Sequence, residues 1–404
     1  MSDTLAILDA LPAPAEFYGR YWNVRPFLAR DAIGDTVLDR LIAPKELAAL
    51  AMEDTARSRL VSGADWSCRF GPFSEDDFAA DLDGFPWSLL VQNVDQFHPP
   101  TADLLRAFGF APRWLVDDIM VSFSTAGGGI GGHIDSYHVF LVQGAGRRRW
   151  TVGHTPVQDE VYVDGLDLKI LKHPVDGDTV EVGPGDVLYV PPRYAHEGTT
   201  LEDALTFSVG FLGPTSSDMR ADFDLHPADG SAAQPDDAPT YEDGDRYIGA
   251  GLTTDSAGFV LAPAAAADLC NRLGVTPDTP DVDTWLASYL TGSTSDDPSH
   301  GAAREDALSP ADFVAALRVA GGVIKPAYVK VALVPSTDPS SDAACLLGVN
   351  RLAFSVREDA VPVVQALMTE DSVTLADMPA LAGDTDLLCA LYNAQAVELL
   401  DRPE

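Results

Sequence analysis

A chain of 404 residues is longer than one typical domain, and its hydrophobic content of 46% is ordinary for a folded protein with buried cores. Its 62 acidic and 26 basic residues give a formal net charge of −36, which disfavours binding to nucleic acid or anionic lipid and indicates either basic partners or adaptation to high salt. Four separated cysteines without a CxxC pair argue against a zinc ribbon or a disulfide scaffold.

The first 110 residues are predicted to form helices and connecting loops. Helices are expected at Leu38–Met52 and Thr101–Phe108, with one strand-like run at Trp87–Gln92. The N-terminus has no basic segment followed by a long apolar run, and no apolar window is long enough to span a bilayer. A cytoplasmic protein without a signal peptide or membrane segment is therefore expected.

From residue 117 to residue 213, short β runs alternate with glycine and proline. Strands are expected at Ile119–Ser124, Val139–Gln143, Arg149–Val152, Thr179–Val182, Val187–Val190 and Leu205–Phe211. Short strands at this spacing favour a barrel or a two-sheet sandwich over βαβ units.

Residues 214–250 and 291–304 have the composition of linkers or long loops. Helices are expected at Ala264–Leu273, Val282–Leu290, Pro310–Val319, Ala360–Met368 and Asp384–Asn393, and strands at Ala327–Pro335 and Cys345–Val356. Helices with a small β ribbon are typical of a winged-helix-like module. Its 7 basic and 15 acidic residues over 301–404 make it a poor phosphate binder, so protein contacts rather than direct DNA binding are expected.

A metal site is indicated by the glycine-rich segment 127–135, which ends in His133-Ile-Asp135. In a strand, residues i and i+2 face the same side, so His133 and Asp135 can reach one ion. His196, which follows a turn, an apolar strand and a Pro-Pro pair, is the expected third ligand. Two histidines and one carboxylate leave coordination positions open, as in non-haem Fe(II) oxygenases, whereas a closed zinc site usually uses cysteine.

The run Arg147-Arg148-Arg149 supplies a candidate partner for an anionic cosubstrate, because a guanidinium can bind a carboxylate through two hydrogen bonds. Strand alternation leaves two possibilities: Arg148 faces the pocket, or Arg147 and Arg149 do. The arginines that face the other way would form a solvated basic edge.

Segments 117–124, 127–150, 183–198 and 207–211 together resemble the bacterial ribosomal oxygenases of the JmjC type, which include arginine 3-hydroxylases of a large-subunit ribosomal protein. The resemblance covers roughly residues 15–215. It implies an α+β chain with three parts. These are a JmjC/cupin double-stranded β-helix (jelly-roll) catalytic domain with N-terminal helices over 1–215, a linker and helical dimerisation region over 216–304, and a winged-helix-like domain over 305–404.

The resemblance also implies roles for individual residues. His133, Asp135 and His196 correspond to the iron ligands, Arg148 to the salt-bridge partner of the 2-oxoglutarate carboxylate, and Ser122 to a hydroxyl partner of the same group. Asp118 and Ser208 correspond to residues that hold the guanidinium of the target arginine, and Met120 and Tyr137 to residues that pack its stem. Asp118 could instead be a surface carboxylate, and Tyr137 could be core packing.

The expected function is an Fe(II)- and 2-oxoglutarate-dependent oxygenase that uses O₂ to hydroxylate an arginine side chain at its 3-position. The expected partners are a basic, arginine-containing loop of a ribosomal protein and a second copy of the chain in a homodimer. Three alternatives stay open: a JmjC demethylase or other protein hydroxylase, a small-molecule cupin oxygenase, and a non-enzymatic cupin scaffold. Decarboxylation of 2-oxoglutarate in the presence of a peptide substrate would separate these alternatives from the expected function.

Overall fold

The computed structural model describes residues 5–79, 84–225, 246–292, 304, 306–336, 342–369, 373–374 and 385–400. The chain divides into two compact units: Met1–Ala107 with Val116–Leu212, and Phe108–Leu115 with Gly213–Glu404. Most of each expected linker lies outside the described residues: 226–245 of the linker 214–250, and 293–303 of the linker 291–304. Within the described part of the chain, no helix is both long and apolar enough to cross a membrane. The finer division at residue 304 stays a prediction.

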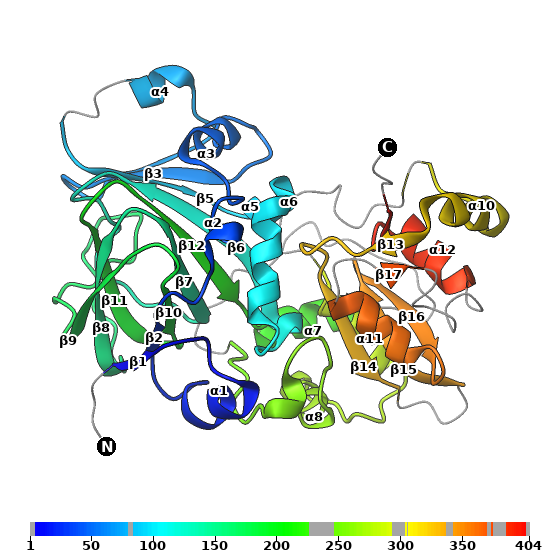
Figure 1. Ribbon diagram of the computed structural model, residues 1–404. Coiled ribbons are helices and arrows are strands. Elements are labelled where there is room, and N and C mark those ends of the chain that lie inside the picture. Colours follow the sequence, from blue (N-terminus) through cyan, green and yellow to red (C-terminus); the bar gives the residue numbers. More distant parts are fainter. Residues whose placement is uncertain are drawn as a thin grey trace. The chain divides into compact units, whose positions relative to one another are not determined.

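The first unit is built on a nine-stranded sheet with the order β1-β2-β10-β7-β12-β6-β5-β3-β4 (Figure 1). The strands are β1 (Ala6–Leu8), β2 (Phe27–Ala29), β3 (Ser58–Ser62), β4 (Cys68–Phe70), β5 (Trp87–Val91), β6 (Val116–Ser124), β7 (His138–Ala145), β10 (Val187–Val190) and β12 (Ala204–Phe211). A second sheet has the order β11-β8-β9, with β8 (Arg148–Pro156), β9 (Gly177–Val182) and β11 (Tyr194–Thr200). The expectation of a barrel or two-sheet arrangement in residues 117–213 is therefore confirmed.

An apolar core joins the two sheets. Leu141 of β7 and Leu188 of β10 pack in the same buried cluster as Trp150 and Val152 of β8 and Tyr194 of β11. In β8 the residues that alternate with Trp150 and Val152 are more accessible: Arg149 is exposed and Thr151 is half-buried. This alternation is expected of a strand with one face in a core, and it decides which side chains of β8 can reach the barrel interior.

The N-terminal region differs from the prediction of helices and loops, because it supplies five strands to the large sheet. Four of them were missed, since strands of three to five residues are too short to show a period. The single helix predicted over Leu38–Met52 is also wrong. Pro44 starts a new helix there, because proline lacks an N–H and forces the preceding Ala43 into an extended conformation. The helices are α1 (Pro14–Arg20), α2 (Asp35–Leu38), α3 (Pro44–Leu50), α4 (Glu75–Ala79), α5 (Val94–Phe97), α6 (Pro99–Ala102) and the 3₁₀ helix η1 (Asp103–Phe108).

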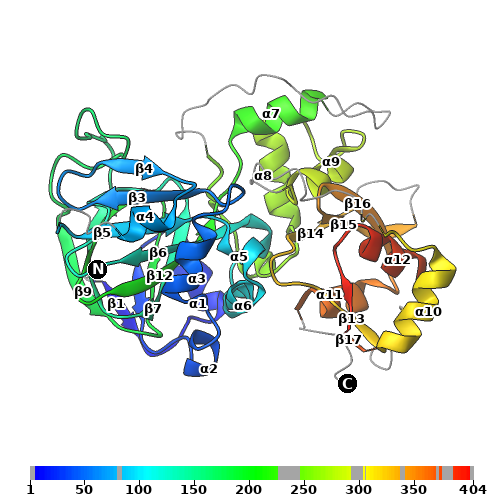
Figure 2. The same ribbon diagram turned by 90° about the horizontal axis from the view of Figure 1, so that it is seen from above.

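The second unit combines helices with two three-stranded sheets, ordered β14-β15-β16 and β17-β13-β18. Its helices are α7 (Ser216–Leu225), α8 (Pro263–Leu273), α9 (Val282–Tyr289), α10 (Pro310–Ala320), α11 (Val361–Thr369) and α12 (Thr385–Asn393). Its strands are β13 (Gly322–Ile324), β14 (Val331–Pro335), β15 (Ala343–Val349), β16 (Leu352–Arg357), β17 (Val373–Thr374) and β18 (Glu398–Leu399). Figure 2 shows α7, α8 and α9 grouped beside β14–β16.

One predicted strand of this unit is in fact a hairpin. The expected strand Cys345–Val356 is broken at Asn350 and Arg351, whose φ angles of 47° and 62° make a tight turn between β15 and β16. Glycine packing also matters here, because a Cβ at Gly348 would lie 1.9 Å from the carbonyl oxygen of Ala287 in α9. The dimerisation and winged-helix roles of this unit stay predictions.

Candidate metal centre and adjoining pocket

The three expected ligands come together. Among the described residues, His133, Asp135 and His196 are the group of histidine and carboxylate side chains whose ligand atoms all lie within 4.8 Å of one another. The prediction that His133 and Asp135 share a regular strand is wrong, because both lie in the irregular segment between β6 and β7. Backbone pairing places them instead: the N–H of His133 donates to the carbonyl of His196 at 3.0 Å, and that of His196 donates to the carbonyl of His133 at 2.9 Å.

The glycines before His133 are required by close packing. A Cβ at Gly129 would lie 2.3 Å from the carbonyl oxygen of Gly198. Gly131 has a φ of +77°, where other residues are strained, and a Cβ there would press against Ile170. The segment can approach both β11 and Ile170 only because these positions carry no side chain.

Both histidines present a free nitrogen to the centre. Nδ1 of His133 lies 3.0 Å from the carbonyl oxygen of Gly131, and Nδ1 of His196 lies 3.1 Å from that of Tyr194. A carbonyl only accepts hydrogen bonds, so each Nδ1 carries the proton and each Nε2 keeps its lone pair. Nε2 of His196 is 3.5 Å from an Asp135 carboxylate oxygen. Burial, with a smaller effect of His133, lowers the pKa of His196 to about 4, so the ring is neutral at neutral pH. This donor set fits a divalent iron ion.

Arg148 is the inward-facing arginine of β8. It is only 4% exposed, and it donates to Oγ1 of Thr206 at 3.2 Å and to the carbonyl of Gly198 at 3.3 Å. Its guanidinium carbon lies 4.8 Å from the ring centre of Trp150. Burial lowers the pKa of Arg148 to about 10, which leaves it charged at neutral pH. It has no ion pair with a carboxylate of the described residues, and its Nε is buried without a hydrogen-bond partner. A buried cation in this state is suited to an anionic ligand.

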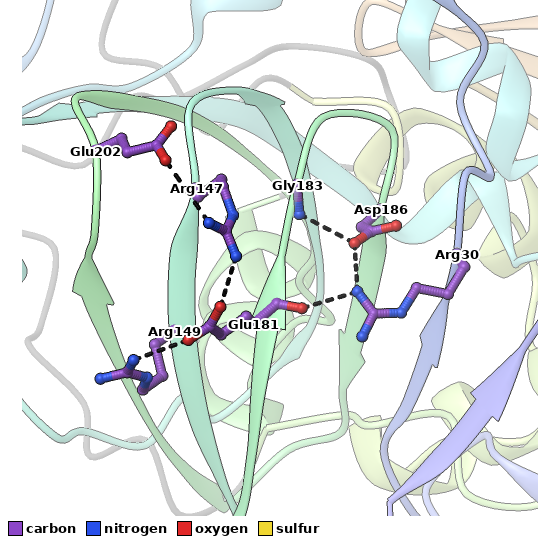
Figure 3. Close-up of polar contacts among 7 residues, drawn as sticks. All are labelled: Arg30, Arg147, Arg149, Glu181, Gly183, Asp186 and Glu202. Carbon is purple, nitrogen blue, oxygen red and sulfur yellow. Dashed lines mark hydrogen bonds and ion pairs between the residues drawn. The ribbon is translucent and has the colours of Figure 1, made fainter.

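Arg147 and Arg149 lie outside the barrel (Figure 3). Each pairs with an oxygen of Glu181, at 2.6 Å for Arg147 and 2.8 Å for Arg149, and both side chains are 49% exposed. The alternative facing of this strand, with these two arginines in the pocket, is therefore wrong. They form the solvated basic edge that the alternation predicted.

Ser122 is also buried in this region. It lies opposite Thr206 across the β6–β12 pair, and its Oγ is 3.5 Å from the Thr206 carbonyl oxygen. Thr206 in turn donates to the side chain of Gln143 at 3.2 Å and accepts from Arg148. Thr206 and Gln143 were missed by the sequence analysis. Alternate residues of a strand share a face, so the position of Ser208 in β12 could have indicated Thr206.

The four expected substrate residues lie around one point of the β6–β12 pair. Met120 faces Ser208 across the two strands. A Cβ at Gly210 would lie 3.6 Å from both Oδ1 of Asp118 and Cε2 of Tyr137, so these two side chains approach each other there. The reading of Asp118 as a surface carboxylate is wrong, because the residue is buried.

Asp118 is a buried carboxylate close to two other carboxylates. Its Oδ2 accepts the backbone N–H of Asn93 at 3.0 Å, and burial, with smaller effects of Asp117 and Asp95, raises its pKa to about 8. Asp95, which the sequence analysis missed, accepts the backbone N–H of Ile119 at 2.8 Å and so fixes β6 beside Asp118. Nothing in the sequence of α5 distinguishes Asp95 from a surface residue.

Known proteins match about half of the chain in sequence. A model of the JmjC domain matches residues 103–219. The ribosomal protein uL16 3-hydroxylase of Escherichia coli is 42% identical over 217 residues, which cover 52% of this chain and 55% of that protein. The chain thus spans about half the length of the curated relatives it matches.

Solved structures extend the similarity along the chain. The X-ray structure of Escherichia coli YcfD is 30% identical with a TM-score of 0.70, and the match covers 96% of this chain and 98% of that one. A structure of YcfD, described as a ribosomal oxygenase in complex with cobalt and 2-oxoglutarate, is 29% identical with a TM-score of 0.67, covering 95% and 97%. These matches confirm the JmjC-type fold class predicted from the sequence.

Proposed function

The chain belongs to the ribosomal oxygenases of the JmjC type, and from this we propose that it is an Fe(II)- and 2-oxoglutarate-dependent oxygenase. Its proposed reaction is hydroxylation of an arginine side chain at the 3-position in a large-subunit ribosomal protein. The observation that carries the proposal is the cluster of His133, Asp135 and His196, in which both Nε2 lone pairs are available, beside the buried cation of Arg148, which pairs with no carboxylate of the described residues.

The chain's own residues would prepare the metal site. His133 and His196 would bind iron through Nε2 and Asp135 through a carboxylate oxygen, and the two Nδ1 hydrogen bonds hold the rings in the required tautomer. Iron, with 2-oxoglutarate and O₂, supplies the oxidising chemistry that inserts oxygen into a carbon–hydrogen bond. No proton needs to leave His196, because its ring is already neutral.

Arg148 would bind the distal carboxylate of 2-oxoglutarate. Thr206 and the Gly198 carbonyl orient its guanidinium, and Trp150 supports the planar face. Ser122 would donate its hydroxyl to the same carboxylate, because it lies opposite Thr206. Binding would relieve the cost of keeping an unpaired cation buried.

Asp118 and Ser208 would receive the guanidinium of the target arginine, with Met120 and Tyr137 against its methylene stem. The raised pKa of Asp118 indicates that the carboxyl is largely protonated in the empty pocket at neutral pH. An arriving guanidinium would favour the ionised form and lower that pKa again. Arginine recognition would thus be coupled to release of one proton.

The partner would be a basic ribosomal protein, for which a net charge of −36 is favourable. A homodimer formed through the region 216–304, a winged-helix-like scaffold over 305–404 without direct DNA binding, and a cytoplasmic location belong to the same proposal. They are supported by the similarity to ribosomal oxygenases along most of the chain.

The test is mass spectrometry of ribosomal protein uL16 after incubation with the enzyme, Fe(II), 2-oxoglutarate and ascorbate. We expect the mass of one added oxygen atom on a single arginine, together with decarboxylation of 2-oxoglutarate. Loss of a methyl group would favour the demethylase. Absence of 2-oxoglutarate turnover with any ribosomal protein would favour the scaffold.

A further inference from the structure

A cavity of about 280 Å³ lies outside the barrel, between the small sheet and the loop of residues 157–176. Its position follows from strand alternation. His196 pairs with Val152, whose side chain is in the core, so both face inward, whereas the adjacent Ala195 and Gly153 face outward and line the cavity. The cavity and the metal centre therefore lie on opposite faces of the same strand.

The lining of this cavity combines an apolar floor with a charged rim. The floor residues Val157, Leu171, Val175 and Ala195 are buried or half-buried, and the apolar lining residues Val161 and Pro174 are exposed at the mouth. The rim carries the carboxylates Asp159 and Asp176 and the imidazoles His154 and His173. Val161, which lines the cavity, is 46% exposed, and its neighbour Val163 is 38% exposed. Apolar side chains that gather at a cavity mouth are a mark of an interaction site.

The loop 157–176 is fixed to the metal-binding segment at its first residues. The N–H of Arg193 donates to the carbonyl of Asp135 at 2.8 Å, and the carbonyl of Arg193 accepts from Val157 at 2.8 Å. The Arg193 guanidinium also donates to the carbonyls of Val157 and Gln158 and to Glu160. Arg193 has a φ of +67°, which is costly for arginine and persists where surrounding contacts enforce it.

The end of the loop is fixed to the same segment. The N–H of Leu171 donates to the carbonyl of Gly132 at 2.7 Å, and a Cβ at Gly132 would lie 3.1 Å from Val175. A loop of this length without helices or strands is uncommon in a compact domain and is usually functional. Its contacts keep it next to the metal ligands rather than free in solvent.

We propose that this loop and cavity are a docking surface for a second basic side chain of the protein substrate, outside the metal centre. The inference rests on the proposed function. The apolar floor suits the aliphatic stem of a lysine or arginine, and Asp159 and Asp176 suit its charged end. Glu160, Asp164 and Asp167 are also exposed along the loop, although Glu160 pairs with Arg193. Against these acidic residues the loop carries two exposed lysines, Lys169 and Lys172. The net charge of the loop is therefore negative, which complements a basic polypeptide and repels a phosphate.

The first experiment reverses the rim charges. We expect the double variant Asp159→Lys/Asp176→Lys to raise the KM for ribosomal protein uL16 about tenfold or more, as loss of two close charge contacts implies, with kcat and the KM for 2-oxoglutarate nearly unchanged. The control Glu53→Lys/Asp54→Lys makes the same charge change at exposed positions after α3 and should leave all three constants unchanged. The isosteric variant Asp159→Asn/Asp176→Asn should raise the KM for uL16 by a smaller factor. It replaces the lysine variant in the test if the lysine variant fails to fold.

The second experiment loosens the loop. Arg193→Gly removes the guanidinium but suits the positive φ, so the fold should persist while uL16 binds more weakly to the cobalt-loaded protein in fluorescence anisotropy. If wild type does not act on uL16, the proposed function fails. If wild type does act, and the rim variants behave like the Glu53/Asp54 control, only the docking inference is overturned.

Discussion

At the scale of single residues, the proposed metal ligands should be separable from the fold. We expect His133→Ala, Asp135→Ala and His196→Ala each to abolish 2-oxoglutarate turnover, because two remaining ligands bind iron poorly. The circular dichroism spectrum should be unchanged, since backbone hydrogen bonds between residues 133 and 196 hold the segment. Normal turnover in one of these variants would remove that residue from the ligand set.

Arg148 and Arg149 form a matched pair for testing the cosubstrate site. Arg148→Ala should raise the KM for 2-oxoglutarate about ten- to a hundred-fold, because a charge-assisted hydrogen bond contributes roughly 1.5–3 kcal/mol. Arg149→Ala removes an exposed arginine that pairs with Glu181 outside the barrel, so that KM should not change. Equal effects of the two substitutions would contradict the assignment of Arg148.

Asp118 should make stability depend on pH. Its pKa is raised from 3.8 to about 8 in the folded protein, so the folded state binds the proton more tightly than the unfolded state. The free energy of unfolding should therefore fall as pH rises from about 4 to 8, and Asp118→Asn should reduce this fall. Urea unfolding at pH 5 and pH 8 measures it. Asp77→Asn is the control, because the pKa of that exposed residue is lowered to about 2, outside this range.

At the scale of elements, β11 brings the cosubstrate site together through a glycine. A Cβ at Gly198 would lie 2.7 Å from Trp150 and 3.0 Å from a guanidinium nitrogen of Arg148. Gly198→Ala should therefore displace Arg148 and raise the KM for 2-oxoglutarate several-fold, with less effect on iron binding. Gly183→Ala, where a Cβ meets nothing within 4 Å, should have no such effect. The KM for 2-oxoglutarate, measured for both variants under the same conditions, tests this prediction, and equal values would contradict it.

The sequence predicted the central strands well and the metal segment poorly. Strands such as β10 and β12 have apolar runs that specify them, and their predicted bounds agree with the structure within one residue. β11 was missed because Tyr194-Ala-His-Glu-Gly-Thr-Thr200 has no apolar alternation. The structure brings His133 and Asp135 together as the sequence predicted, but backbone pairing with His196, and not a shared strand, positions them. The buried Asp95 depends on packing that no local pattern encodes, whereas Thr206 shares a face of β12 with Ser208 and could have been predicted from strand alternation.

At the scale of the whole molecule, the net charge of −36 should affect both stability and substrate binding, and salt should change the two in measurable ways. Screening weakens self-repulsion, so the melting temperature should rise with KCl concentration. Screening also weakens attraction to a basic substrate, so the KM for uL16 should rise over the same range. Melting and kinetic measurements across a KCl series test both. A KM that is indifferent to salt would mean that the acidic surface serves stability alone.

The reciprocal backbone hydrogen bonds between His133 and His196 give the main chain and the side chains of the centre different roles. The main chain sets where the ligand positions stand, while the side chains set which ion is preferred there. The positions of these residues and the identity of their donor atoms can therefore change independently. A substitution that changes only a donor side chain should leave the backbone pairing, and the barrel around it, in place.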